Sequence, residues 1–127
     1  MTTVLAVIPT YNEVGNITRL IQDVCKVLAD NGYAYRILVV DDNSPDGTAE
    51  AVEEIGRGDG WVHLLKRRGK LGLGSAYVDG FNWALSNLPF DILVQMDADF
   101  SHLPSDAVRL VEAVEKGSDV AVASRYV

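Results

Sequence analysis

The sequence has 127 residues, the size of one ordinary domain, and its 48% hydrophobic content is typical of a globular protein. A net charge of −7 argues against a general nucleic-acid-binding surface, because such surfaces carry an excess of Lys and Arg. The one cysteine, Cys25, excludes an internal disulfide, no apolar run reaches the length of a membrane span, and the N-terminus lacks the features of a signal peptide. These properties predict a soluble cytosolic chain.

Short apolar runs alternate with amphipathic segments along the chain. In chain order, the predicted elements are strand 4–8, helix 14–28, strand 35–40, a helix from 46 or 48 to 55, strand 62–65, helix 77–88, strand 91–96, helix 104–114 and strand 119–123. Asn16 is expected to cap the first helix, while Gly32, Gly56 and Gly117 are expected to end the first, second and fourth helices. The third helix is expected to bury its apolar face: Tyr77, Phe81, Ala84, Leu85 and Leu88.

This alternation predicts right-handed crossovers and an α/β fold with a mainly parallel sheet, in strand order 3-2-1-4-5. The sequence as given supplies no element after 119–123. We therefore expect an incomplete domain of residues 1–127, cut short at its C-terminal side. A bare apolar edge strand there favours self-association.

Polar segments follow every predicted strand, and ligands of open α/β sheets bind beyond the carboxyl ends of the strands. The segments are 9–13 (PTYNE), 41–48 (DDNSPDGT), the basic Gly-rich loop 66–74, 97–99 (DAD) and Arg125. On charge alone, the basic loop is interpreted as solvated. Asp46 is interpreted as a structural turn residue and Asp42 as a functional one, since carboxylates accept hydrogen bonds from a base or a ribose well.

The acidic pair Asp97 and Asp99 is the sharpest local signal. Alternate residues at the end of a strand point the same way, so the two carboxylates converge. Two anions held close repel each other unless a cation lies beside them, and hard carboxylate oxygens suit Mg²⁺ or Mn²⁺. A metal site is favoured here over a solvated strand end or a helix cap. His63 is interpreted as structural, and the role of His102, beside the acidic pair, is left open.

Taken together, these segments resemble the inverting GT-A glycosyltransferases, and within them the dolichol- or polyprenyl-phosphate mannosyltransferases. The resemblance covers essentially the whole chain, in the order of that family: 9–13 (PTYNE), 40–48 (VDDNSPDGT), 70–77 (KLGLGSAY), 96–104 (MDADFSHLP) and 124–127 (SRYV). It implies a Rossmann-like GT-A core that binds a nucleotide sugar.

The resemblance also implies roles for individual residues. The residues implied to line the nucleotide sugar are Pro9, Tyr11, Glu13, Val40, Asp42, Asp97, Ala98, Asp99 and Arg125. Asp97, Asp99 and Ser101 would hold Mg²⁺ or Mn²⁺; some family members have a glutamine where Ser101 stands, and a serine hydroxyl is a poorer ligand. Asp99 and Arg125 are the implied catalytic residues, with Arg125 facing the donor phosphates or the acceptor phosphate.

The reaction implied is transfer of mannose from GDP-mannose to a polyprenyl (dolichyl) phosphate, with inversion. A divalent metal would stabilise the charge that develops on the departing GDP. A phosphate monoester with a second pKa of about 6 is largely dianionic at neutral pH, so no catalytic base is expected. The lipid acceptor implies action at the cytoplasmic face of a membrane, with membrane contact through a C-terminal part or a partner subunit.

Other protein classes fit the sequence less well. A response-regulator receiver domain would carry its acidic pair after the first strand and a lysine after the fifth. A nicotinamide-binding domain needs Gly-x-Gly-x-x-Gly after the first strand, where Pro9, Thr10 and Tyr11 stand instead. A GT-A enzyme with another nucleotide sugar and a catalytically inactive nucleotide-binding fragment both stay open.

Overall fold

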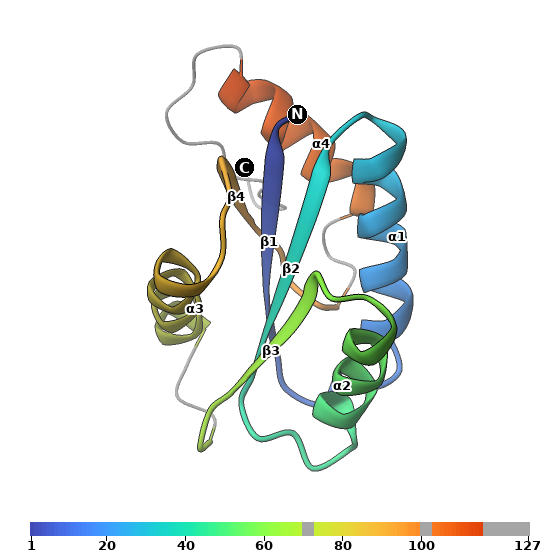
Figure 1. Ribbon diagram of the computed structural model, residues 1–127. Helices are drawn as coiled ribbons and strands as arrows, with labels where there is room; N and C mark the ends of the chain where they lie inside the picture. Colours follow the sequence, from blue (N-terminus) through green and yellow to red (C-terminus); the bar gives the residue numbers. More distant parts are fainter. Residues whose placement is uncertain (70–72, 100–102, 116–127) are drawn as a thin grey trace, which may run out of the picture.

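The computed structural model describes residues 1–69, 73–99 and 103–115. In this part of the chain, four strands alternate with four helices (Figure 1). The elements are β1 (Thr3–Thr10), α1 (Ile17–Asp30), β2 (Ala34–Asp41), α2 (Thr48–Gly58), β3 (Val62–Lys66), α3 (Leu73–Asn87), β4 (Ile92–Gln95) and α4 (Pro104–Glu115). All eight were predicted from the sequence, with small differences at their ends.

The strands form one sheet in the order β3-β2-β1-β4, and every pair is parallel. The predicted order is therefore confirmed for the first four strands, whereas the predicted strand 119–123 and Gly117 lie outside the described residues. Because the pairing is parallel, the carboxyl ends of all four strands meet at one edge of the sheet, the lower end in Figure 1. This edge is where the polar segments of the sequence come together.

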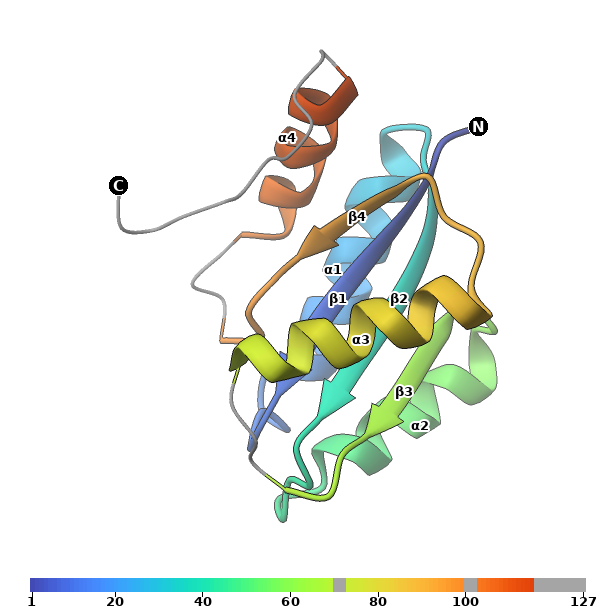
Figure 2. The ribbon, with the colours of Figure 1, turned by 90° about the vertical axis from the view of Figure 1, so that its left-hand side faces the viewer.

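The sheet is the middle of three layers. Helix α3 crosses one face, and α1, α2 and α4 cover the other (Figure 2). Side chains of β1 alternate between the two sides: Val4, Ala6 and Ile8 belong to the core on the α1 side, and Leu5 and Val7 to the smaller core under α3. A strand covered on both faces is apolar throughout, as the run 4–8 predicted.

Two helix ends differ in how they form. Gly32 has a φ of +84°, and α1 ends just before it, as predicted. The prediction that Gly56 stops the second helix was wrong, because α2 continues to Gly58. A Cβ at Gly56 would lie 3.0 Å from the carbonyl oxygen of Val62. This glycine therefore allows α2 to pack closely on the start of β3, and it does not break the helix.

The buried face of α3 consists of small residues. Ala76 and Ala84 are buried, and a Cβ at Gly80 would lie 2.9 Å from methyl groups of both Val7 and Val40. Small residues at spacings of four thus let the helix lie directly on β1 and β2. The prediction that larger residues cover the sheet was wrong for two of them, because Phe81 is 41% exposed and Leu85 is 59% exposed.

Among the described residues, none of the helices is both long enough and apolar enough to cross a membrane.

The packing of α3 predicts that Gly80→Val destabilises the fold by about 2–3 kcal/mol, since valine methyl groups of two strands would have to move. Gly74→Val, in the same helix, is the matched control: a Cβ there meets nothing within 4 Å. It should change the unfolding free energy by about 0.5 kcal/mol or less. Chemical denaturation measures both variants, and equal unfolding midpoints would contradict this account of the packing.

Candidate functional site

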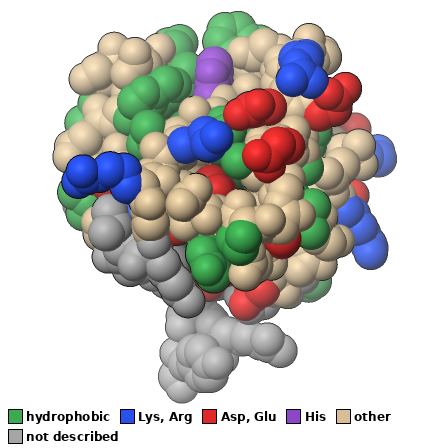
Figure 3. All heavy atoms as spheres, turned by 90° about the horizontal axis from the view of Figure 1, so that it is seen from below, with side chains coloured by type: hydrophobic (Ala, Val, Ile, Leu, Met, Phe, Trp, Pro, Cys, Tyr) green, Lys and Arg blue, Asp and Glu red, His purple; other side chains and the backbone are tan. Residues whose placement is uncertain are grey.

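The carboxyl edge of the sheet carries charged side chains of both signs. Figure 3 looks onto this edge, where Asp and Glu side chains and Lys and Arg side chains lie close together. Four connections form it, those after β1, β2, β3 and β4. Polar segments after these strands were predicted to meet at this edge, with the basic loop after β3 interpreted as solvated.

The connections after β1 and β2 are joined by hydrogen bonds. The backbone N–H of Asn12 donates to Oγ of Ser44 at 2.9 Å, and that of Glu13 donates to Oγ1 of Thr48 at 3.0 Å. Asp46 accepts the backbone N–H of Val14 at 3.1 Å. Hydrogen bonds to Thr48 lower the pKa of Asp46. These contacts support the structural role predicted for Asp46.

Asp41 is fully buried at the end of β2 and stabilises the same junction. Its Oδ1 accepts hydrogen bonds from the hydroxyls of Thr10 at 2.7 Å and Ser44 at 2.6 Å, and its Oδ2 accepts the backbone N–H of Ser44 at 2.9 Å. With both oxygens occupied in the interior, Asp41 has a structural task. It fixes the end of β1 against the turn that follows β2.

Predicted nucleotide-binding residues at these two strand ends differ in exposure. Tyr11 is 37% exposed and Glu13 is partly exposed. Pro9 is buried, and Val40, opposite it in the register, is fully buried in the core under α3. A contact from Val40 to a nucleotide would therefore go through its backbone.

A buried ion pair between Arg67 and Asp42 joins the ends of β3 and β2 at this edge. Nε of Arg67 lies 2.5 Å from Oδ1 of Asp42, and Nη2 lies 2.9 Å from Oδ2. Nη1 donates to Oγ of Ser75 at 2.7 Å and to Oδ2 of Asp79 at 3.0 Å. The hydrogen bond to Asp42 raises the pKa of Arg67 above its ordinary value. The guanidinium thus joins the ends of β2 and β3 to α3.

This network corrects the interpretation of the basic loop as solvated. Lys66 and Arg68 are exposed, but Arg67 between them is buried. The same network also engages Asp42, which was predicted to contact a base or ribose. Both of its oxygens already face Arg67, so a ligand there would meet a carboxylate held in one orientation.

The acidic segment after β4 begins where pairing with β1 ends. The backbone N–H of Met96 still donates to the carbonyl of Val7 at 3.1 Å. Met96 and Ala98 are buried, whereas Asp97 is half-buried and Asp99 is exposed. β4 ends at Gln95, so both carboxylates follow the strand, and their pointing the same way stays a prediction. The side chain of Ala98 lies in the core on the α1 side.

Tyr77 on α3 contacts this acidic segment, a contact that was not predicted. Its hydroxyl donates to Oδ1 of Asp97 at 3.1 Å. Burial raises the pKa of Tyr77, and the negative charges of Asp97 and Asp99 raise it further. Apolar spacing identified Tyr77 only as a core residue. Its hydroxyl is what reaches the site.

Asp97 and Asp99 are a pair, and within the described part of the chain no three His, Cys, Asp or Glu side chains gather into a metal-binding group. The two side chains nevertheless suit a hard divalent cation, because such cations prefer oxygen ligands and both side chains are carboxylates just after the end of a strand. A metal held there would need further oxygen ligands from a phosphate-bearing substrate. The other predicted residues, Ser101 and Arg125, lie outside the described residues, as does His102.

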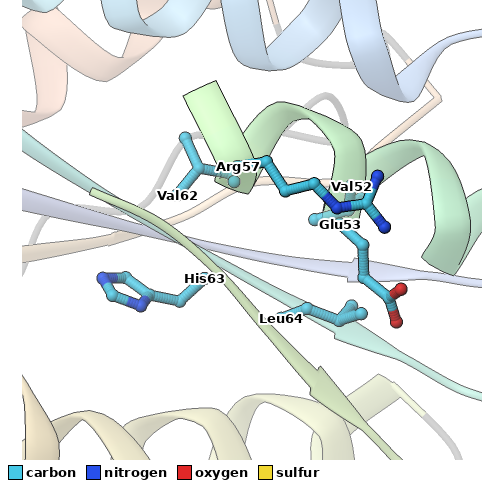
Figure 4. A pocket seen from close by; sticks show the side chains of 7 residues that line it. Val52, Glu53, Arg57, Val62, His63 and Leu64 are labelled. Carbon is cyan, nitrogen blue, oxygen red and sulfur yellow. The ribbon is translucent and has the colours of Figure 1, made fainter. Parts of the chain in front are cut away.

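A cavity of about 400 Å³ lies away from these groups, between α2 and β3 (Figure 4). Glu53 and Arg57 of α2 line it together with Leu64 of β3, and none of the predicted site residues does so. His63, which also lines it, packs against Trp83 with ring centroids 5.9 Å apart. Burial lowers the pKa of His63, in keeping with its predicted structural role.

A parallel sheet in this order, with polar connections gathered at its carboxyl edge, has the topology of the open α/β folds that bind ligands beyond that edge. Residues 5–127 match the family model described as Glycosyl transferase family 2. The chain therefore belongs to glycosyl transferase family 2. The family assignment does not favour the receiver-domain and nicotinamide-binding alternatives.

Curated relatives match nearly the whole chain. It is 44% identical over 124 residues to the polyprenol monophosphomannose synthase of Mycolicibacterium smegmatis, covering 97% of this chain and 45% of the relative. It is 42% identical over 124 residues to the undecaprenyl-phosphate mannosyltransferase of Micrococcus luteus, covering 98% of this chain and 49% of the relative. The chain thus spans about half the length of these curated relatives.

A solved structure extends the comparison to ligands. The fold is similar to that of the mannosyltransferase PcManGT from Pyrobaculum calidifontis in complex with GDP-Man and Mn²⁺. The TM-score is 0.57 at 27% sequence identity, covering 76% of this chain and 27% of that one. The predicted GT-A fold class is confirmed.

The buried ion pair predicts that Arg67→Met destabilises the fold by about 3–5 kcal/mol, because it leaves the Asp42 carboxylate buried without its cation. Arg57→Met is the control: Arg57 pairs with Glu54 on the surface, where both side chains are about 70% exposed. It should change stability by about 0.5 kcal/mol. Urea denaturation of both variants tests this, and a loss in Arg67→Met no larger than that in Arg57→Met would show that the pair is not an important contact.

Proposed function

We propose that this chain carries the donor site of an enzyme that transfers mannose from GDP-mannose to a polyprenyl phosphate, with Mg²⁺ or Mn²⁺. The observation that carries the proposal is the acidic pair after β4, in a chain 44% identical over nearly its whole length to a polyprenol monophosphomannose synthase. The named relatives and the GDP-Man complex agree on mannose as the transferred sugar.

The metal belongs at Asp97 and Asp99 in this proposal, with Ser101 as a further candidate ligand. Carboxylate oxygens are the ligands that hard divalent cations prefer, and such cations also bind diphosphates. When bound, the metal would stabilise negative charge on the departing GDP. Asp97 and Asp99 would hold the donor diphosphate through that cation, since carboxylates alone repel a diphosphate, and would so orient the bond to mannose.

The nucleoside is proposed to lie along the ends of β1 and β2. Tyr11 and Glu13 present exposed or partly exposed side chains there, and Asp42 presents a carboxylate that Arg67 holds in place. A carboxylate in this setting accepts N–H groups of a base or O–H groups of a ribose. Pro9, Val40 and Ala98 would contribute backbone, and Arg125 would face the phosphates of donor or acceptor.

The acceptor needs little activation. A lipid phosphate monoester has a second pKa of about 6, so its oxygen is a ready nucleophile at neutral pH and attack opposite GDP inverts the anomeric carbon. A polyprenyl chain resides in a bilayer, which places the proposed reaction at a membrane surface. We place it on the cytoplasmic face, in keeping with a chain whose one cysteine is free.

The proposal predicts that GDP binds more tightly with Mn²⁺ than with EDTA, and that Asp99→Asn abolishes this difference because one metal ligand loses its charge. UDP should bind more weakly than GDP under both conditions. Isothermal titration calorimetry on folded protein measures these affinities. Asp23→Asn on α1 is the control: Asp23 faces Arg19 in an exposed pair, and its loss should leave GDP binding unchanged.

Equal GDP affinity with Mn²⁺ and with EDTA would contradict the metal site. Tighter binding of UDP than of GDP would instead point to another nucleotide sugar on the same fold.

A further inference from the structure

Tyr77 and Asp97 join two elements at the candidate site. The Tyr77 hydroxyl, on α3, donates to Oδ1 of Asp97, which follows β4, over a distance of 3.1 Å. The ring of Tyr77 is half-buried and packs against the core under α3, which includes Ala76 and Leu5. The hydroxyl therefore extends from a fixed ring to the first carboxylate of the acidic pair.

The helix that carries Tyr77 is fixed on both sides of it. Ser75 and Asp79, two residues before and two residues after Tyr77, both accept hydrogen bonds from Arg67. One turn further on, Gly80 holds α3 in close contact with Val7 and Val40. The position of the phenol is thus set by a buried ion pair and by close packing, independently of any ligand.

The hydrogen bond between Tyr77 and Asp97 has one direction, from the phenol to the carboxylate. A neutral phenol donates one proton, and an ionised carboxylate only accepts, so the hydrogen bond uses one lone pair of Oδ1 and leaves Oδ2 available. Groups that bond to a metal ligand from behind orient it, and their loss typically weakens metal binding 10- to 100-fold. A carboxylate already held in one orientation needs no rearrangement when the cation arrives.

We propose that Tyr77 is a positioning residue that holds the Asp97 carboxylate in the orientation in which it binds the divalent metal of the donor diphosphate. The inference rests on the proposed function, which puts the metal at Asp97 and Asp99. It adds a residue on α3 that acts through Asp97 and does not touch the metal.

The test is a titration of Mn²⁺ into the protein with GDP, followed by electron paramagnetic resonance, which reports free and bound Mn²⁺ directly. Tyr77→Phe removes only the hydroxyl and should weaken Mn²⁺ affinity about 10-fold. Tyr35→Phe is the matched control, since the hydroxyl of Tyr35 donates to Oδ2 of Asp59 at 2.6 Å, in a contact that involves none of the candidate site residues. It should leave Mn²⁺ affinity unchanged. Circular dichroism establishes that both variants are folded.

A double-mutant cycle with Asp97→Glu, which keeps a charged metal ligand on a longer side chain, separates positioning from a general loss of structure. If Tyr77 acts through Asp97, adding Tyr77→Phe to Asp97→Glu should weaken Mn²⁺ binding no further. Equal Mn²⁺ affinity in Tyr77→Phe and the unmodified protein would overturn the inference and leave the proposed metal site standing. Additive losses in the double variant would also overturn it. No Mn²⁺ binding by the unmodified protein would remove the proposed site and the inference together.

Discussion

The close packing of α3 on β1 and β2 is the contact on which the candidate site depends. Gly80 leaves no room for even one more carbon against Val7 and Val40, so the helix has one position on the sheet. That position brings Ser75 and Asp79 to Arg67, and Tyr77 to Asp97. One helix, α3, thus contacts both parts of the carboxyl edge: the ends of β2 and β3, and the segment after β4.

The buried guanidinium of Arg67 is the second constraint. A charge taken out of water is costly unless it is paired and hydrogen-bonded, and here Asp42, Asp79 and Ser75 surround it. The arrangement keeps the Asp42 carboxylate in one orientation before any ligand arrives. Pre-organisation of this kind lowers the cost of ordering a site on binding. In the proposed site, Asp42 would thus meet the nucleoside of the donor, and Asp97 would meet its diphosphate, each in an orientation set before binding.

Much of this architecture was readable from the sequence. Uninterrupted apolar runs such as 4–8 marked strands buried on both faces, and the polar residues after each run marked the edge where they meet. The acidic pair stood out because two carboxylates held close repel each other unless a cation lies beside them. These signals are local, so one sequence carries them.

The features missed from the sequence depend on contacts between distant segments. Arg67 looks like a solvated cation until Asp42, which lies 25 residues before it in the chain, is placed beside it. Tyr77 has the spacing of a core residue, and only the structure shows that its hydroxyl reaches beyond the core. Phe81 was assigned to the buried face of α3 because apolar periodicity does not show that small residues such as Ala76 and Gly80 take the contact with the sheet.

The central claim is that α3 and the end of β4 together form a metal-dependent donor site, and a crystal structure with GDP and Mn²⁺ tests it most directly. Anomalous scattering identifies the manganese without reference to its ligands. The account predicts a peak bonded to carboxylate oxygens of Asp97 and Asp99 and to the diphosphate, with the Tyr77 hydroxyl still on the Asp97 carboxylate. A manganese peak elsewhere, or GDP bound at the carboxyl edge with no metal at Asp97 and Asp99, would contradict it.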